Sequence, residues 1–159
     1  MSMEKSRTFW DEKSTRTLLQ QCIDQILKKQ RQGSSFSPTG WKNILSGFNK
    51  NSGKSLDRKQ LKNRYDSLKK EWKVWDKLFA KETGISYDSV NHKVIAEDEW
   101  WDRKIQENPQ YAKYRYNGIK FARELEIIFK MVWHWVHYNT HHLQHRVMVK
   151  MMCTGPQWT

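Results

Sequence analysis

Cationic and amide side chains recur at helical spacing along one segment of this 159-residue chain: Lys59, Lys62, Asn63, Lys70 and Lys73. In a helix they lie opposite an apolar stripe with alternating steps of four and three, formed by Leu61, Tyr65, Leu68, Trp72, Trp75 and Phe79. Ammonium groups bind phosphates or guanine acceptors, and an asparagine amide can pair bidentately with adenine. The pattern indicates a helix able to enter a DNA major groove. A surface helix with a solvated basic face would have the same pattern.

The distribution of charge favours the first interpretation. The formal net charge is +12 and the sequence pI is about 9.7. Residues 1–90 contain 19 Lys and Arg against 10 Asp and Glu, whereas residues 91–117 contain five of each and residues 118–159 contain five against two. A positive field attracts polyanions, and the excess lies in the part that contains the candidate helix. RNA, acidic proteins and membrane surfaces remain alternative partners of such a charge.

Composition excludes several other classes of protein. No apolar run is long enough to cross a bilayer, and the first residues lack the apolar core of a signal peptide. Two cysteines, Cys22 and Cys153, cannot form a disulfide framework or a zinc site alone. We expect Cys22 to be a reduced core residue in an intracellular protein.

Turn and capping signals predict an all-α fold. A first helix begins near Thr8 or Asp11 and buries apolar residues up to Leu27, before a loop at residues 33–35. Ser37 and Pro38 begin a second helix that ends at residues 51–53, and Ser55 caps a third helix that continues toward Lys81. The short link between the second and third helices is typical of a helix-turn-helix. The core aromatic residues are Trp10, Trp41, Tyr65, Trp72 and Trp101.

Several blocks resemble the plant Myb/SANT-like domain family, the trihelix-related branch of the Myb fold. Trp10 and Trp41 resemble its first two core tryptophans, and Tyr65 stands where the third is usual. The segment 82–88 is similar to the family's Thr-Gly-x-Gly-Trp-Asp turn, and residues 95–102 are similar to its closing acidic-Trp helix. The resemblance implies a domain over residues 6–120, with a three-helix core at about 8–82 and a closing helix at about 97–107. For the tail that follows, 121–159, helical and disordered segments both remain open.

The third helix also resembles the recognition helix of classical plant Myb repeats. Lys62 and Asn63 match its base-reading Lys-Asn pair, whereas Asp66 stands in place of the second base-reading Asn. A carboxylate there repels phosphate unless it accepts a hydrogen bond from a cytosine amino group, so target preference does not transfer.

The remaining basic residues are assigned to the DNA backbone, because phosphate contacts dominate such interfaces. Lys59, Lys69, Lys70 and Lys73 are the phosphate candidates on the third helix, and Lys42 and Lys54 are anchors near the starts of the second and third helices. Arg64 lies nearer the apolar stripe, where a structural ion pair and a DNA contact are both open.

No catalytic motif, cofactor or metal site is predicted. Glu97, Asp98, Glu99 and Asp102 are explained as acids at a helix start. His134, His137, His141 and His145 would share one helical face, but no carboxylate or cysteine accompanies them. The tail from about Met131 could bind a partner, lie on a membrane surface or be poorly ordered.

The resemblance implies a nuclear double-stranded DNA-binding protein, a Myb-like transcription regulator and not an enzyme. Two alternatives are a SANT-like module that binds chromatin or another nuclear protein, and a transposon-derived Myb-like accessory protein. We expect neither membrane association nor a small-molecule substrate.

Overall fold

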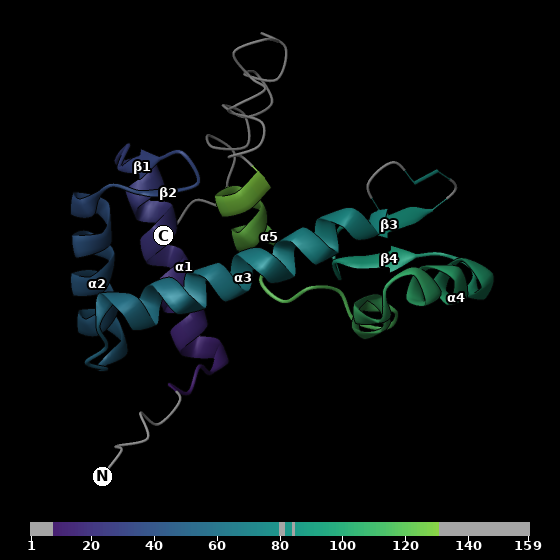
Figure 1. Ribbon diagram of the computed structural model, residues 1–159, viewed down its shortest axis with the longest axis horizontal. Helices are drawn as coiled ribbons and strands as arrows, with labels where there is room; N and C mark the ends of the chain where they lie inside the picture. Colours follow the sequence, from purple (N-terminus) through teal and green to yellow (C-terminus); the bar gives the residue numbers. More distant parts are fainter. Residues whose placement is uncertain (1–7, 80–81, 84, 131–159) are drawn as a thin grey trace, which may run out of the picture.

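The computed structural model describes residues 8–79, 82–83 and 85–130, which form a mainly helical fold (Figure 1). The helices are α1 (Glu12–Leu27), α2 (Pro38–Ser52), α3 (Arg58–Phe79), α4 (Asp98–Glu107), the 3-10 helix η1 (Pro109–Tyr114), α5 (Ala122–Leu125) and the π-helix η2 (Glu126–Lys130). Two antiparallel hairpins join them: β1 (Arg31–Gln32) with β2 (Ser35–Phe36), and β3 (Ser86–Asp88) with β4 (Lys93–Ile95).

The first two helices begin where their capping residues predict. Asp11 caps α1 by accepting hydrogen bonds from the Ser14 hydroxyl at 2.6 Å and the Ser14 amide at 2.7 Å, and these bonds lower the pKa of its carboxyl group. Ser37 caps α2 by accepting from the Gly40 amide at 3.0 Å, and Gly53 ends α2 in the left-handed conformation with φ +70°. Burial of the apolar face of α1 is confirmed at Leu18, Leu19 and Cys22 but is wrong at its end, because Leu27 lies in the last turn and is 59% exposed.

The start of α3 differs from the prediction. Asp57, and not Ser55, caps this helix: its carboxylate accepts from the Gln60 amide at 2.8 Å, while the Gln60 side chain accepts from the Asp57 amide at 2.9 Å. This reciprocal pair is a capping box and satisfies two N–H groups at the helix start. The preceding connection is held by Asn49, whose side chain bonds both the amide and the carbonyl of Leu56 at 3.0 Å.

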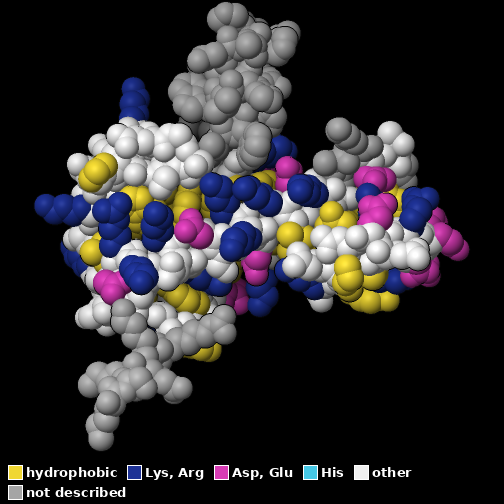
Figure 2. All heavy atoms as spheres, viewed as in Figure 1, with side chains coloured by type: hydrophobic (Ala, Val, Ile, Leu, Met, Phe, Trp, Pro, Cys, Tyr) yellow, Lys and Arg dark blue, Asp and Glu magenta, His cyan; other side chains and the backbone are white. Residues whose placement is uncertain are grey.

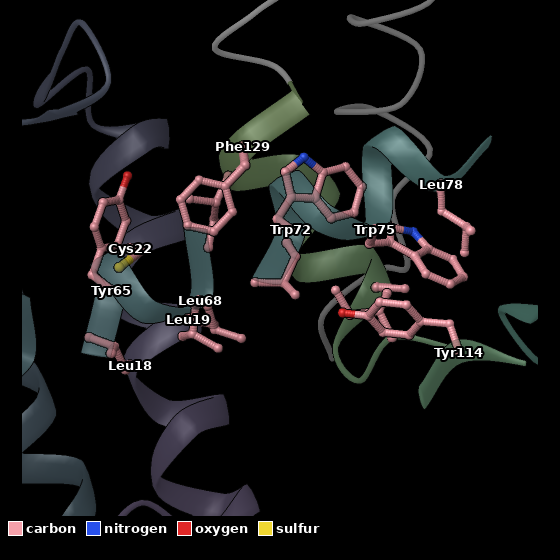
Figure 3. Packing of buried hydrophobic residues seen from close by; sticks show 14 of the residues in the cluster. Leu18, Leu19, Cys22, Tyr65, Leu68, Trp72, Trp75, Leu78, Tyr114 and Phe129 are labelled. Carbon is pink, nitrogen blue, oxygen red and sulfur yellow. The ribbon is translucent and has the colours of Figure 1, made fainter. Parts of the chain in front are cut away.

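A continuous apolar core follows the inner side of α3 (Figure 3). At one end Trp41 meets Tyr65 edge-to-face at 5.5 Å and Phe36 at 5.6 Å. Further along α3, Trp72 and Trp75 are buried, so the core interpretation of these two rings is confirmed. The side chain of Phe79 lies outside the described part of the structure. All other predicted stripe residues of α3 are buried. The opposite face of this helix therefore points to solvent.

The second half of α3 supports a separate group of elements (Figure 1). Trp75 packs edge-to-face on Tyr114 of η1 at 5.1 Å and lies 6.4 Å from the ring of Tyr87 in β3. Helix α4 packs on η1, and its Trp100 and Trp101 are buried. The predicted closing helix therefore exists, but η1 and the hairpin contribute much of the cover over Trp75.

The C-terminal part of the described chain belongs to the same core. Helices α5 and η2 contact both α1 and α3. Leu125 and Ile128 are fully buried, and Phe129 packs on Tyr65 with ring centroids 5.2 Å apart. The core thus continues past the domain boundary predicted at residue 120.

The two hairpins were not predicted. Each strand has only two or three residues, too few to show an alternating apolar pattern. The first hairpin turns at Gly33 and Ser34, where Gly33 has φ +57°. A Gly-Ser pair between two strands is a recognised hairpin signal. Residues 33–35 could therefore have predicted a hairpin, whereas only a loop was predicted there.

Candidate nucleic-acid interface

The predicted basic residues of α3 form one exposed face along the helix. Six of the seven candidates on this helix are exposed: Lys59, Lys62, Asn63, Asp66, Lys70 and Lys73. Their spacing of three and four residues keeps them on one side. Figure 2 shows Lys and Arg side chains in a row over α3, with acidic side chains among them. From Lys59 to Lys73 the face extends about 21 Å at 1.5 Å per residue.

Two other elements flank the middle of α3. The Tyr65 hydroxyl donates to the carbonyl of Ser34 at 3.1 Å, and the Trp41 indole donates to the Ser35 hydroxyl at 3.2 Å. The turn between β1 and β2 and the first turn of α2 are therefore fixed beside α3. Helices α2 and α3 also contact each other, as the predicted helix-turn-helix requires; in that motif the second helix enters the groove and the first approaches the backbone.

Lys69 differs from the other lysines of the face, because it is half-buried at its edge. Burial lowers the pKa of its ammonium group, and the nearby charge of Lys73 lowers it further. The Arg31 charge also acts on Lys69. The Arg31 guanidinium donates to the carbonyl of Ile128, and its pKa is lowered by burial. Arg31 thus adds a cation beside the α3 face and also ties η2 to the first hairpin.

Lys42 and Lys54, the two predicted anchors outside α3, lie in different surroundings. Lys42 is exposed and follows Trp41 in the first turns of α2. The Lys54 ammonium donates to the carbonyl of Phe9 at 3.2 Å, and its charge helps to lower the pKa of Asp11. Lys54 is therefore held against the start of α1.

Arg64 makes contacts within the fold. Its guanidinium donates to the Thr15 hydroxyl at 3.1 Å and lies over the Trp10 ring at 5.8 Å, and burial lowers its pKa. Trp10 in turn packs on Phe48 of α2 at 5.3 Å. Arg64 joins α3 to α1, on the side away from the basic face.

Two cations of α3 were missed by the sequence reasoning. Arg58 precedes Lys62 by four residues, is exposed, and lies over the Trp41 ring at 6.0 Å. Lys77 follows Lys73 by four residues and is also exposed. The spacing that identified the central lysines would have found both, since residues four apart share a helix face.

Asp66 is exposed in the middle of this basic face. Lys62 and Lys70 stand four residues before and after it. Within the described residues its carboxylate has no salt bridge with either lysine. The acceptor oxygens of Asp66 are therefore available to a ligand that docks on α3.

Two of the acidic residues at the start of α4 form ion pairs within the fold. Arg115 binds Asp98 at 2.9 Å and Asp102 at 3.1 Å, and these bonds raise the pKa of its guanidinium. In the described part of the chain no group of three or more His, Cys, Asp or Glu side chains is placed to hold a metal ion. The predicted histidine face at 134–145 and the tail from Met131, with Cys153, lie outside the described residues.

No described helix is both long enough and apolar enough to cross a bilayer.

The Cys22 thiol is buried in the core, and burial raises its pKa to about 12. The predicted core position of Cys22 is confirmed.

Comparison with known proteins gives two matches. A family model described as the Myb/SANT-like DNA-binding domain matches residues 9–104. The chain is 30% identical over 125 residues to an Arabidopsis thaliana protein named "L10-interacting MYB domain-containing protein", and the match covers 79% of this chain and 28% of that relative. No solved structure matches significantly. The family model spans more than half of the sequence and includes α1 to α3 with most of α4, so the chain belongs to the Myb/SANT-like DNA-binding domain family.

Proposed function

We propose that the protein binds double-stranded DNA in the nucleus as a Myb-like transcription regulator, with α3 in the major groove. One observation carries the proposal: α3 buries one face in the aromatic core and presents an exposed face of lysines, Asn63 and Asp66 along its length. Family membership supports the same activity. The major groove is about 12 Å wide and admits a single α-helix of this kind.

The exposed face divides into two kinds of contact. A straight helix of about 21 Å cannot keep every residue at the floor of a curved groove, so its middle approaches bases and its ends approach phosphates. Lys62, Asn63 and Asp66 are the residues that we assign to base edges. We assign the phosphate contacts to Lys59, Lys69, Lys70, Lys73 and Lys42, and we include Arg58 and Lys77 because both are exposed on α3.

The salt dependence of binding tests the proposal directly. Each lysine that neutralises a phosphate contributes about 0.9 to the slope of log affinity against log salt. A variant with four exposed lysines replaced by glutamine should therefore have a slope lower by about 3.6. The measurement is fluorescence anisotropy with random-sequence duplex at several salt concentrations. The four replaced residues are Lys59, Lys70, Lys73 and Lys77.

A matched control removes four lysines from other elements and changes the net charge equally. The control residues, all exposed, are Lys13, Lys93, Lys113 and Lys120. Its slope should stay within about one contact, or 0.9, of the unmodified protein. Absence of duplex binding at low salt, or equal loss in both variants, would refute α3 as the DNA-binding helix.

Base reading is tested by comparing Lys62→Ala and Asn63→Ala with Lys70→Ala. The first two should each cost on the order of 1–3 kcal/mol at the preferred site and relax its sequence preference. Lys70→Ala should weaken all sequences alike, because a phosphate contact reads no base. Selection from random duplex DNA supplies the preferred site. Equal losses on selected and random DNA in all three variants would show that α3 does not read bases through this pair.

Asp66 should give the interface a preference for cytosine. Its carboxylate can accept from the N4 amino group of cytosine, but it has no donor for the N7 acceptor of adenine or for phosphate oxygens. In selections from random duplex, Asp66→Asn should replace one preferred cytosine by adenine, because asparagine pairs bidentately with adenine. Asp76→Asn removes the same charge from another exposed position of α3 and should leave the preferred sequence unchanged. An unchanged site in Asp66→Asn would exclude base contact by Asp66.

A second function, binding of a protein partner, is supported by a separate observation. The Arabidopsis relative is named for an interaction with L10. In this chain the face of α3 is basic, whereas the elements beyond Trp75 have an acidic surface. We propose that the domain also contacts a protein through those elements.

A further inference from the structure

The first hairpin and α2 belong to a segment without acidic side chains. Residues 25–56 contain six Lys and Arg side chains and no Asp or Glu. The segment includes β1, β2 and the whole of α2. Carboxylates on a protein surface repel the phosphates of nucleic acid, so a basic segment without them is suited to lie against a phosphate backbone.

The turn of the first hairpin is fixed beside the middle of α3. The Tyr65 hydroxyl donates to the carbonyl of Ser34 at 3.1 Å. Lys62, Tyr65 and Lys69 follow one another at steps of three and four residues and therefore share one edge of α3. The hairpin turn thus adjoins the edge of the basic face that carries Lys62 and Lys69.

Two cations lie near each other at this edge without a counter-ion. The pKa of the half-buried Lys69 ammonium group is lowered by burial and by the charges of Lys73 and Arg31, and Asp66 offsets this only in part. Neither Arg31 nor Lys69 forms a salt bridge within the described residues, and residues 131–159 contain no Asp or Glu. Like charges held close together repel each other. A phosphate brought by another molecule would relieve this repulsion.

The tip of the hairpin offers neutral donors next to these cations. The Gln32 amide and the Ser34 hydroxyl are exposed, and neither forms a hydrogen bond within the described residues. Between them Gly33 has φ +57°, and no other part of the fold lies within 4 Å of the place where its Cβ would stand. Amide and hydroxyl side chains are common partners of phosphate oxygens in complexes with DNA. The tip is therefore open to a phosphate and equipped to bind one.

We propose that residues 32–34 and Lys69 form a site, named the hairpin phosphate site, for one phosphate of the DNA strand that borders the groove occupied by α3. The Lys69 ammonium pairs with the phosphate, and the Gln32 amide and the Ser34 hydroxyl donate to its oxygens. Arg31 acts through its charge alone, because its Nε and Nη1 atoms are buried and its guanidinium donates to the carbonyl of Ile128. The inference rests on the proposed binding of duplex DNA by α3 and adds the first hairpin as a second contact element.

The experiment scans the duplex that the unmodified full chain selects from random DNA. One phosphate at a time is replaced by a neutral methylphosphonate, and affinity is measured by fluorescence anisotropy. At one phosphate beside the α3 footprint the unmodified protein should lose about fivefold or more in affinity, whereas Gln32→Ala/Ser34→Ala should lose less than about twofold there, because groups in contact couple. Lys69→Gln should remove the sensitivity at the same phosphate. Unchanged circular dichroism shows that the variants are folded.

Two matched controls accompany these variants. Gln106→Ala/Gln110→Ala removes two exposed side-chain amides from α4 and η1, at the other end of α3 from the first hairpin (Figure 1). It should keep the complete methylphosphonate profile of the unmodified protein. Lys59→Gln removes a lysine from the first turn of α3 and should remove the sensitivity at a different phosphate from Lys69→Gln.

Three results would overturn the hairpin phosphate site while duplex binding by α3 stands. The profile of Gln32→Ala/Ser34→Ala could equal that of the unmodified protein. The hairpin variant and Lys69→Gln could act on different phosphates. Both variants could instead weaken binding to every duplex by the same factor, as a loss without a local contact would. If no duplex is bound at all, the proposed function itself fails and the site fails with it.

Discussion

A chain that ends at Lys120 is expected to be largely unfolded, whereas a chain that ends at Lys130 should keep the helical fold. The ten residues between these ends include the fully buried Leu125 and Ile128, and Phe129 at 3% exposure. Loss of one such side chain costs about 2–5 kcal/mol. Three losses together approach or exceed the total stability of a small domain, about 5–15 kcal/mol.

Within the described structure, no other segment provides the contacts that residues 121–130 make with Tyr65 and Arg31. Phe129 closes the aromatic group around Tyr65, and the carbonyl of Ile128 accepts from the buried Arg31 guanidinium. Removal would expose Tyr65 and leave this cation without that acceptor. Breaking such a buried contact adds the cost of an unsatisfied polar group.

Thermal melts followed by circular dichroism compare the chains 1–120, 1–130 and 1–159. Phe129→Ala in the full chain serves as a graded test and should lower the free energy of unfolding by about 3–5 kcal/mol. Equal melting temperatures for 1–120 and 1–130 would show that α5 and η2 add nothing to the core. A 1–130 chain without helical signal would show that residues after Lys130 are needed for the fold.

The parts of the fold predicted correctly are those with strong local signals. Ser37 and Pro38 fixed the start of α2, and the alternating apolar stripe of α3 identified its buried face. Both depend on residues close in sequence, where the physical cause of the pattern is short-range. The cap of α3 was misplaced because Ser55 and Asp57 are both good capping residues, and the choice depends on Gln60 completing a capping box.

The missed features depend on contacts between residues far apart in sequence. Nothing near Arg31 indicates that its guanidinium reaches Ile128, 97 residues later. Nothing in the local sequence indicates that the Lys54 ammonium donates to the carbonyl of Phe9, 45 residues earlier. The segment 122–129 did contain a helical apolar spacing, at Ala122, Leu125 and Ile128, but no motif of the resembled family marked it as core.

The candidate DNA-binding face was predictable for the same reason as α3 itself. Helical spacing places Lys62, Asn63 and Lys70 together whatever the tertiary structure. Tertiary contacts decide which side of the helix is buried, and the aromatic stripe already indicated that side. The cover over Trp75 could not be predicted, because it requires the pairing of β3 with β4 and the packing of Trp75 on Tyr114.

Replacement of Trp41 by alanine is expected to lower the free energy of unfolding by about 3–5 kcal/mol. Trp41 is 1% exposed and lies where α2, α3 and the first hairpin meet. Its ring packs edge-to-face on Tyr65 and Phe36, and its indole N–H donates to Ser35. The substitution would leave a cavity among three elements, and Arg58 would lose the ring that it covers.

Chemical denaturation with tryptophan-independent detection by circular dichroism measures the change. Trp41→Phe keeps an aromatic ring in the site and should cost less than Trp41→Ala, because it loses the indole hydrogen bond and only part of the volume. Tyr116→Ala removes an aromatic ring that is 73% exposed and should change stability by no more than about 0.5 kcal/mol. Because Trp41 also positions the first turn of α2 beside α3, Trp41→Ala should weaken duplex binding even at temperatures where the chain is still folded. Unchanged denaturation of Trp41→Ala would mean that this ring is not central to the core, and the helix-turn-helix arrangement built on it would be wrong.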